Sequence, residues 1–501
     1  MTIDIRNLTF GYEGTDVLLF DNVTLKIDTN WKLGLIGRNG RGKTTFLRLL
    51  KGELSGSGTI TGCPEFVSFP FEIDDEYELG GDIIRGICPN AQDWEIRREM
   101  NYLELDDDVL FKPYFMLSGG EKTKLQLISL FLDDLHFPLI DEPTNHLDER
   151  GREVTASYLK RKGGYILISH DRHFLDTATD HTMAINKTNV EISPVNFSTW
   201  WDEMKRKEKF EEAQNNKLKK DIARLKKSEE AAERWSEASE RKKIGFDPTK
   251  VEKNISRRSY EGAKAAKMMR HAKAMENRYE KKIDEKSSLL KNQEKKEALK
   301  ISGEKHYSDL LIKAKDITLY YDDDRICEPF DIEIHQGDKV AISGINGCGK
   351  STFLKMLGGL NPDNFRYEGD LIMASNLSIA YVHQDTSSLM GSLRDYAYDI
   401  KADYTQMITI LRKMGFSKDN LEQDISTFSE GQKKCVLIAG SLCLKPHLFI
   451  WDEPMNYIDI YIREVLEDLI KEADITIVCV EHDRTFKDNV IENEVVIHRC
   501  R

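Results

Sequence analysis

Residues 33–47 read LGLIGRNGRGKTTFL, and residues 340–354 read VAISGINGCGKSTFL. Each stretch holds the pattern G-x-x-x-x-G-K-[S/T] between an apolar strand-like run and a helix-like run, which is the context of a phosphate-binding loop. Glycines let backbone N–H groups close on phosphates, the lysine carries charge to the β- and γ-phosphates, and the hydroxyl ligates Mg²⁺. The residues expected to bind nucleotide are Gly37, Asn39, Gly40, Gly42, Lys43, Thr44 and Thr45 in the first stretch and Gly344, Asn346, Gly347, Gly349, Lys350, Ser351 and Thr352 in the second.

Two further motifs recur in the same order along the chain. They are DEPTNHLD at 141–148 with DEPMNYID at 452–459, and SHDRHF at 169–174 with EHDRTF at 481–486. The three pairs of landmarks are separated by 307, 311 and 312 residues. Because a nearly constant offset marks a duplicated domain, the sequence predicts two copies of one α/β domain, at 1–195 and 306–501.

The acidic pairs Asp141-Glu142 and Asp452-Glu453 each end an apolar run. Ligands of open α/β sheets bind at the carboxyl ends of strands, where an aspartate suits the shell of Mg²⁺ and a glutamate can orient and deprotonate an attacking water. An isolated acidic pair is more often a solvated turn, but two copies at matching distances from a phosphate-binding loop favour hydrolysis. We therefore expect Thr44, Asp141, Ser351 and Asp452 to hold Mg²⁺ and Glu142 and Glu453 to be catalytic.

These motifs together resemble the ATP-binding-cassette superfamily, and the resemblance implies further site residues. LSGGE at 117–121 is similar to its signature motif, which contacts the γ-phosphate held by the opposite domain. The implied signature residues are Ser118, Gly119, Gly120, Ser429 and Gly431; the implied catalytic switch histidines are His170 and His482. Tyr12 and Tyr321 lie where the family stacks a ring on adenine, although a lone tyrosine near a strand is more often a core or rim residue.

Two positions depart from the family's pattern. The second signature reads FSEGQ at 428–432, with Glu430 in place of the first glycine. The glutamine that helps the family to sense Mg²⁺ is matched by Gln384, whereas Phe71 stands at the equivalent position of the first copy. If the copies pair head to tail, the first phosphate-binding loop meets the altered signature. We therefore predict unequal sites, with the second hydrolysing faster.

Composition and charge place the chain among globular proteins of more than one domain. Its 501 residues exceed the usual size of a single core, and 40% are hydrophobic against 32% charged. No apolar run reaches the roughly 18–20 residues of a membrane span, the start shows no signal-peptide pattern, and the eight cysteines form no Cys-x-x-Cys pair. We expect a soluble, cytoplasmic protein with reduced thiols and no membrane partner.

The formal net charge of −13 conceals a basic segment between the copies. Residues 201–300 carry 30 Lys and Arg against 20 Asp and Glu, and apolar residues recur there at the 3-4 spacing of paired helices. Gly245 and Pro248 interrupt the pattern. The sequence predicts an α-helical hairpin linker at 196–305 with a tip loop near 239–262.

Charge around this tip favours a nucleic-acid partner. Residues 241–273 carry 11 Lys and Arg against three acids, enough to bind phosphates through salt-sensitive contacts. A charge run is usually only a solvated face, but here the charge has one sign and is concentrated at the predicted tip. The expected RNA or tRNA contacts are Arg241, Lys242, Lys243, Ile244, Phe246, Arg257 and Arg258.

The twin cassettes and the linker resemble the ABC-F family, whose members act on ribosomes, over essentially the whole chain. The stretches 31–43, 137–148 and 262–267 are similar to the Lsa/Vga-type antibiotic-resistance proteins, which bind the ribosomal exit site and relieve lincosamides, streptogramin A and pleuromutilins. The resemblance implies an ATPase that needs ATP and Mg²⁺, binds ribosomal RNA and tRNA, and is a monomer off the ribosome. A translation or ribosome-assembly factor without drug protection is the alternative. A cassette engine for a separate membrane protein is less favoured.

Overall fold

The computed structural model describes residues 1–12, 18–132, 136–186, 189–244, 301–322, 324–360 and 364–500, with the backbone alone for residues 225, 226 and 228–244. The chain divides into two units, of which the first comprises Met1–Trp200 with Ala298–Arg501 and the second Trp201–Glu297. The first unit contains both copies of the repeat. We call residues 1–195 cassette 1 and residues 306–501 cassette 2.

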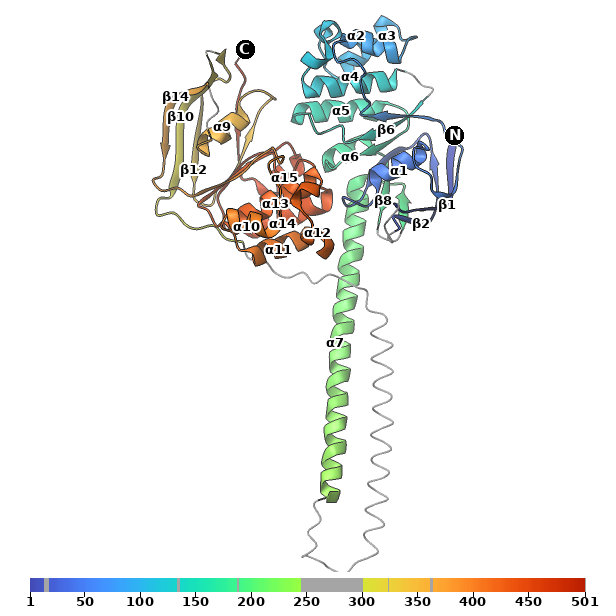
Figure 1. Cartoon of the computed structure of the whole chain (residues 1–501), viewed down its shortest axis with the longest axis vertical. Coiled ribbons are helices and arrows are strands. Elements are labelled where there is room, and N and C mark those ends of the chain that lie inside the picture. The colour runs from blue at the N-terminus through green and yellow to red at the C-terminus, as the bar shows by residue number, and fades with distance from the viewer. Residues whose placement is uncertain are drawn as a thin grey trace, which may run out of the picture. The chain divides into compact units, whose positions relative to one another are not determined.

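Cassette 1 is built on a sheet of strand order β5-β6-β7-β3-β8-β9, in which β8 and β9 pair antiparallel and the other neighbours pair parallel. Figure 1 labels β6 and β8 of this sheet. A second, antiparallel sheet has the order β2-β1-β4. The strands are β1 (Thr2–Phe10), β2 (Phe20–Asp28), β3 (Lys32–Ile36), β4 (Ser57–Thr61), β5 (Glu65–Phe69), β6 (His136–Asp141), β7 (Tyr165–Ile168), β8 (His181–Ile185) and β9 (Val190–Ser193). The helices are α1 (Lys43–Leu50), α2 (Gly80–Ile87), α3 (Asp93–Tyr102), α4 (Gly119–Phe131), α5 (Glu149–Arg161) and α6 (Arg172–Ala178), with 3₁₀ turns η1 (Asp107–Phe111) and η2 (Tyr114–Met116).

Cassette 2 repeats this plan with a parallel sheet of order β15-β16-β17-β13-β18 and an antiparallel sheet in which β10 pairs with β11, β12 and β14. The strands are β10 (Leu310–Tyr321), β11 (Asp324–Arg325), β12 (Phe330–His335), β13 (Lys339–Ser343), β14 (Phe365–Met373), β15 (Ile379–Val382), β16 (Leu448–Asp452), β17 (Ile477–Val480) and β18 (Asn493–Val496). The helices are α9 (Lys350–Leu357), α10 (Leu393–Asp399), α11 (Tyr404–Lys413), α12 (Lys418–Glu422), α13 (Glu430–Cys443), α14 (Ile460–Glu472) and α15 (Arg484–Val490), with the 3₁₀ turn η3 (Ile425–Thr427). The predicted fold class, α/β with two tandem cassettes, is confirmed.

The central strands explain why the motifs gather in one place. In β7 and β16 every residue is buried, as in parallel strands covered on both faces, and the sequence is an apolar run throughout β7 and up to Asp452 in β16. Strands β3, β6 and β7 run parallel, as do β13, β16 and β17, so their carboxyl ends meet at one edge of each sheet. That edge carries the phosphate-binding loop, the acidic pair and the histidine motif of each cassette.

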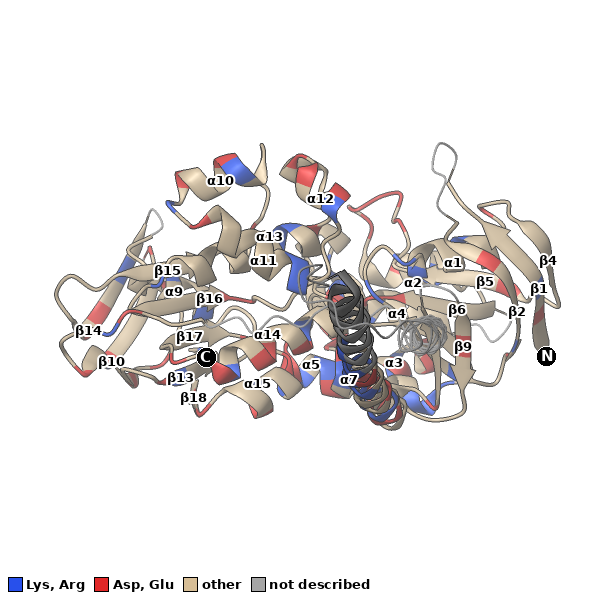
Figure 2. Cartoon of the chain, turned by 90° about the horizontal axis from the view of Figure 1, so that it is seen from below, with Lys and Arg blue, Asp and Glu red and all other residues tan. Residues whose placement is uncertain are grey.

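Helix α7 (Phe197–Ile244) follows cassette 1. It begins next to the predicted boundary at 195 and continues to Ile244, so positions 239–244 of the predicted tip loop are helical. Both signs of charge lie along the part of α7 whose side chains are described (Figure 2). The other predicted hairpin arm and the rest of the tip lie outside the described residues.

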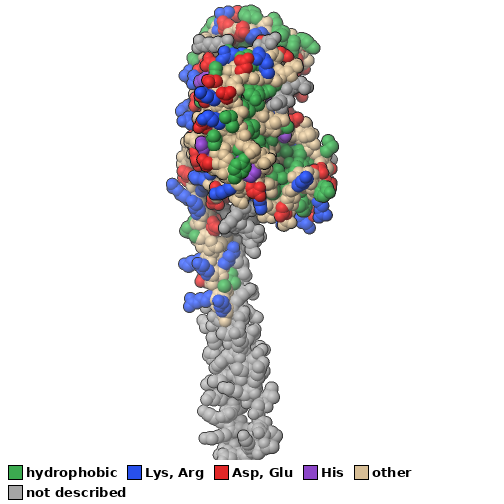
Figure 3. Space-filling model, turned by 90° about the vertical axis from the view of Figure 1, so that its left-hand side faces the viewer, with side chains coloured by type: hydrophobic (Ala, Val, Ile, Leu, Met, Phe, Trp, Pro, Cys, Tyr) green, Lys and Arg blue, Asp and Glu red, His purple; other side chains and the backbone are tan. Residues whose placement is uncertain are grey.

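The described surface is mixed in character. On the face drawn in Figure 3, acidic and basic side chains are interspersed, and hydrophobic side chains lie in groups between them. No helix within the described ranges combines the length and apolar character needed to span a bilayer.

Candidate functional site

The phosphate-binding loop of cassette 1 curls around a buried lysine. The loop joins β3 to α1, and Gly42 caps the helix with a φ of 86°, a left-handed conformation that glycine adopts without strain. The Lys43 Nζ donates to the carbonyl of Gly37 at 2.8 Å and to the side-chain oxygen of Asn39 at 3.2 Å. The amine and the start of α1 therefore lie at one place, an arrangement that suits an anion.

Cassette 2 builds the same loop between β13 and α9. Gly349 caps α9 with a φ of 95°, and the Lys350 Nζ donates to the carbonyls of Gly344 at 2.8 Å and Ile345 at 3.1 Å. The other residues predicted to bind phosphate lie in the loop or in the first turn of the helix that follows it. They are Asn39, Gly40, Thr44 and Thr45 in cassette 1 and Asn346, Gly347, Ser351 and Thr352 in cassette 2. Both loops fit the phosphates of a nucleotide.

The four residues predicted to hold Mg²⁺ by a hydroxyl or an aspartate form two pairs. The Thr44 hydroxyl donates to the Asp141 carboxylate at 2.9 Å, and the Ser351 hydroxyl donates to the Asp452 carboxylate at 2.9 Å. Burial raises the pKa of both aspartates, against the lowering effect of these hydroxyls. Each pair joins a hydroxyl to a carboxylate, the oxygen ligands that Mg²⁺ takes, so these side chains fit the ion.

The predicted catalytic glutamates follow β6 and β16 with positive φ angles, 52° for Glu142 and 46° for Glu453. Their backbone N–H groups donate to the carbonyls of Ile168 at 2.9 Å and Val480 at 3.0 Å, which holds each residue at the end of its sheet. Burial, with the neighbouring Asp141, raises the pKa of Glu142 to about 8. Burial also raises the pKa of Glu453.

The predicted switch histidines lie beside these glutamates. The His170 Nε2 is 3.3 Å from the Glu142 Oε1, and the His482 Nε2 is 3.8 Å from the Glu453 Oε1. Burial, together with the lysine of the same phosphate-binding loop, lowers the pKa of both histidines well below its usual range. Neither contact has hydrogen-bond geometry, so Glu142 Oε1 and His482 Nε2 are buried without a hydrogen-bond partner among the described residues, as expected where a polar reactant enters.

The two glutamates differ in their partners. Glu453 Oε2 accepts from the Gln384 amide at 2.7 Å and from the Asn456 amide at 2.6 Å. Glu142 accepts one longer bond, from the His170 backbone N–H at 3.4 Å. In cassette 1, Phe71 replaces the glutamine, and its carbonyl accepts from Gln126 instead. The difference expected from the sequence is therefore visible in the contacts of the two glutamates.

The signature motifs are helix beginnings. Ser118 caps α4 by accepting from the Glu121 N–H, and Ser429 caps α13 by accepting from the Gln432 N–H. Gly119 and Gly120 occupy the first turn of α4, and Gly431 occupies that of α13. A Cβ added to Gly431 would lie 3.2 Å from the Asn39 amide nitrogen of cassette 1, so this signature approaches the opposite phosphate-binding loop.

Each phosphate-binding loop is also bonded to the opposite cassette. Asp459 accepts from the Asn39 N–H at 2.8 Å and, with its other oxygen, from the Ile462 N–H at 2.9 Å at the start of α14. Asp148 similarly accepts from the Asn346 N–H at 3.4 Å and from the Gly151 N–H at 2.8 Å at the start of α5. The cassettes thus contact each other head to tail.

The two predicted adenine-stacking residues are partly exposed. The Tyr12 ring is 45% exposed and its hydroxyl lies 2.9 Å from that of Thr45, beside the first phosphate-binding loop. Tyr321 ends β10, is 37% exposed, and packs against Phe365. Both rings are accessible to a planar ligand, and their role stays a prediction.

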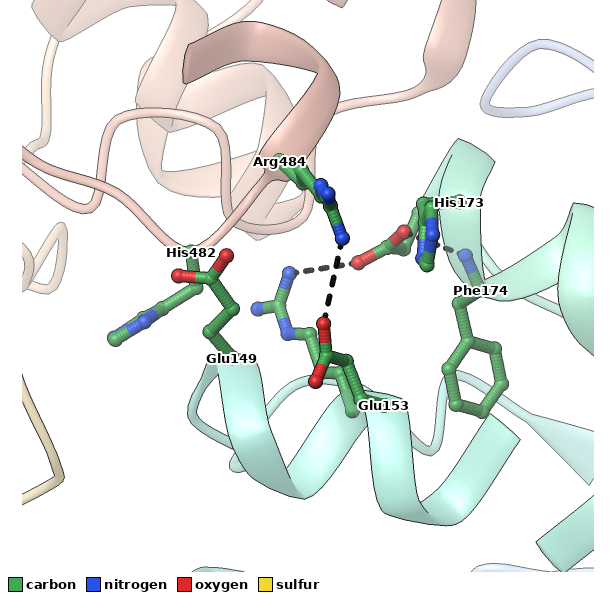
Figure 4. Close-up of a pocket in the computed structure, with 8 residues that line it drawn as sticks. Glu149, Glu153, His173, Phe174, His482 and Arg484 are labelled. Atoms are coloured by element: carbon green, nitrogen blue, oxygen red, sulfur yellow. Dashed lines mark hydrogen bonds and ion pairs between the residues drawn. The ribbon is translucent and has the colours of Figure 1, made fainter. Parts of the chain in front are cut away.

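Ion pairs between the cassettes were not foreseen. Arg172 contacts the buried Glu467 carboxylate of cassette 2. Figure 4 shows a small pocket where Arg484 reaches Glu153 at 3.4 Å, with His482 and His173 nearby. In both copies of the third motif an arginine, Arg172 or Arg484, stands two residues after the histidine. This repeated arginine was the only indication of these ion pairs in the sequence.

Two buried ionisable residues of cassette 2 were also missed. Lys434 and Glu481 stand where cassette 1 has Thr123 and Ser169. Lys434 is 1% exposed and Glu481 is 2% exposed. Burial lowers the pKa of Lys434 to about 8 and raises the pKa of Glu481. A lysine inside an apolar helical run, at KKCVLIAG, could have indicated the first of them.

Comparison with known proteins supports the same picture. The family described as ABC transporter matches residues 20–145 and 327–456. The ribosome protection protein VmlR of Bacillus subtilis (strain 168) is 25% identical over 497 residues, 97% of this chain and 85% of that protein. The ABC transporter F family member 5 of Arabidopsis thaliana is 25% identical over 557 residues, 99% of this chain and 75% of that protein. Among solved structures, the complex of archaeal ribosomal stalk protein aP1 and archaeal ribosome recycling factor aABCE1 shares the fold, with a TM-score of 0.65 at 18% identity over 98% of this chain and 87% of that one.

Proposed function

Because the chain belongs to the ABC transporter family and carries its domain twice, we propose that it is an ATPase that binds ribosomes and protects them from antibiotics of the peptidyl-transferase centre. Similarity to the ribosome protection protein VmlR along 97% of the chain carries this proposal. The drugs concerned are lincosamides, streptogramin A and pleuromutilins. The protein then works in the cytoplasm, as a monomer when it is off the ribosome.

The site residues have distinct roles in this proposal. The two phosphate-binding loops hold ATP together with the opposite signatures, and the hydroxyl–aspartate pairs hold Mg²⁺, with Gln384 beside the second. When bound, ATP supplies the phosphoryl group and Mg²⁺ neutralises part of its charge. Glu142 and Glu453 orient water and, as ionised carboxylates, accept its proton, and the neutral histidines beside them hold the reacting groups in place. Tyr12 and Tyr321 stack on the adenines.

Nucleotide binding and hydrolysis set the timing of ribosome binding in this scheme. Head-to-tail contacts such as Asn39 with Asp459 close the cassettes, and hydrolysis opens them. The basic residues at 241–273 grip ribosomal RNA and tRNA, and the binding is therefore salt-dependent. A protein with both Glu142→Gln and Glu453→Gln should stay on ribosomes in the presence of ATP. Equal release of this variant and the unaltered protein, measured by co-sedimentation, would contradict the cycle.

A second function is compatible with the same similarities. The ABC transporter F family member 5 matches this chain at the same 25% identity as VmlR, so identity alone does not favour drug protection. A translation or ribosome-assembly factor with the same ATPase is therefore the alternative.

Cell-free translation separates the two. Ribosomes from a susceptible bacterium are inhibited by a lincosamide or a pleuromutilin and supplied with the protein and ATP; the Glu142→Gln, Glu453→Gln double variant serves as the matched control. Dose-dependent rescue by the unaltered protein alone is expected. ATP-dependent ribosome binding without rescue would favour the alternative, and no binding at all would remove the ribosomal role.

A further inference from the structure

Two side chains of helix α13 hold the loop that follows β15. The Lys434 Nζ donates to the carbonyls of His383 at 2.8 Å and Gln384 at 3.4 Å, and also to the carbonyl of Asp452 at 3.1 Å. One turn earlier, the Glu430 carboxylate accepts from the Thr386 hydroxyl. We call Glu430 and Lys434 the α13 clamp. Its two members, four residues apart on one helix face, fix the loop at both ends.

The clamp occurs only in the cassette that has the glutamine. Ser118 and Ser429 cap α4 and α13, so the cassette 1 counterparts of the clamp residues are Gly119 and Thr123. A glycine has no side chain, and a threonine hydroxyl is too short to make contacts that a lysine makes through four methylenes. Phe71 stands in for the glutamine there. The departure from the signature and the presence of Gln384 are thus parts of one arrangement.

The clamp acts at the end of the loop nearest Glu453. The side-chain amide of Gln384 donates to the Glu453 carboxylate at 2.7 Å, while the backbone carbonyl of Gln384 accepts from Lys434. Because the Asp452 carbonyl accepts from the same ammonium group, one buried cation ties the loop to the strand end that carries the acidic pair. Burying an ammonium group is costly unless hydrogen bonds replace its water, so an apolar residue would fill this space more favourably if packing were its only role.

We propose that Glu430 and Lys434 are positioning residues that hold Gln384 against Glu453, and that they link the signature helix facing the first phosphate-binding loop to hydrolysis in the second. The link follows from position: Glu430 lies between Ser429, which caps α13, and Gly431, which approaches Asn39 of cassette 1. The altered signature therefore serves the second site. This inference rests on the proposed ATPase activity.

The test isolates the second site by placing Glu142→Gln in the full-length chain. Lys434→Thr and Glu430→Gly then introduce the residues of cassette 1, and Lys434→Met fills the space without a charge. Since a misplaced catalytic group costs on the order of tenfold or more in rate, we expect Lys434→Thr and Lys434→Met to lower kcat about tenfold, with KM for ATP changed less than about twofold. Lys434→Arg should recover part of the loss. Thr123→Val in cassette 1 is the matched control and should leave kcat unchanged.

A double-mutant cycle identifies positioning through Gln384. If the clamp acts by holding the glutamine, Lys434→Thr should cost less than about twofold in a Gln384→Ala background, because residues that act as one unit are not additive. Equal losses in both backgrounds, or a raised KM with kcat unchanged, would overturn the inference while the ATPase activity stands. Binding of a fluorescent ATP analogue shows that each variant is folded. Absence of hydrolysis by the parent chain would overturn the proposed activity itself, and this inference with it.

Discussion

Removing one catalytic glutamate at a time should show that the two sites contribute unequally. Glu453 accepts two short amide bonds, at 2.6 and 2.7 Å, whereas Glu142 accepts one bond at 3.4 Å. A hydrogen bond to a charged group contributes about 1.5–3 kcal/mol, and about 1.4 kcal/mol corresponds to tenfold in rate. If a single such bond favours the oriented glutamate in the transition state, the second site supplies roughly nine-tenths of the turnover.

The expected result is therefore asymmetric. Glu453→Gln should leave about a tenth of the steady-state phosphate release at saturating ATP, and Glu142→Gln should leave about nine-tenths. Equilibrium binding of a nucleotide analogue serves as the control that each variant still has both sites. Comparable losses from the two single variants would refute the reasoning, since they would mean that the amide partners of Glu453 do not affect its rate.

Two predictions concern stability. Arg172→Met leaves the buried Glu467 carboxylate without its guanidinium partner and should lower the free energy of unfolding by about 3–5 kcal/mol. Arg484→Met removes an ion pair whose arginine is 51% exposed and should lower it by at most about 1 kcal/mol. Equal shifts of the urea midpoint for the two variants would contradict this. Burial raises the pKa of Glu99, but hydrogen bonds from Lys162 and Arg98, with the charge of Lys162, outweigh burial and lower the pKa. The contribution of Glu99 to stability is therefore present above the ordinary glutamate pKa of 4.5 and is lost as the pH falls through the lowered value. Glu99→Gln should therefore lower the urea midpoint at pH 7 and have a diminishing effect at acidic pH, and a pH-independent difference would count against it.

The parts of the site that sequence could predict are those that local chemistry dictates. A phosphate-binding loop needs glycine at Gly42 and Gly349 because the backbone there is left-handed, and it needs a lysine directly after. The acidic pairs could be found because each follows an apolar run of a buried parallel strand, and β6 and β16 each end at the aspartate of the pair. Each of these requirements restricts residues that are close together in the sequence, so the motifs can be recognised without the structure. The two cassettes and their order along the chain were therefore predictable.

What sequence could not supply depends on contacts between distant segments. The place of Lys434 beside an apolar helical run could attract notice, but only the fold shows that its amine reaches three carbonyls. Arg172 resembles any helix-start arginine until Glu467 of the other cassette lies beside it. Positions 239–244 are part of helix α7, and the sequence there contains no glycine or proline, so the loop boundary placed at 239 had no helix-breaking residue behind it.

Asp148 and Asp459 each use the two oxygens of one carboxylate for two different hydrogen bonds. One oxygen starts a helix of its own cassette, and the other holds the phosphate-binding loop across the interface. Parting of the cassettes would break only the second bond, and the helix would keep its first turn. The contact between the cassettes can therefore separate and re-form without local unfolding. The carboxylate oxygen that loses its partner stays in position on the capped helix and can accept the same bond again. An asparagine at either position would keep a good cap while removing the charge offered to the other half, so the strength of the joint can be adjusted independently of the stability of the parts it joins.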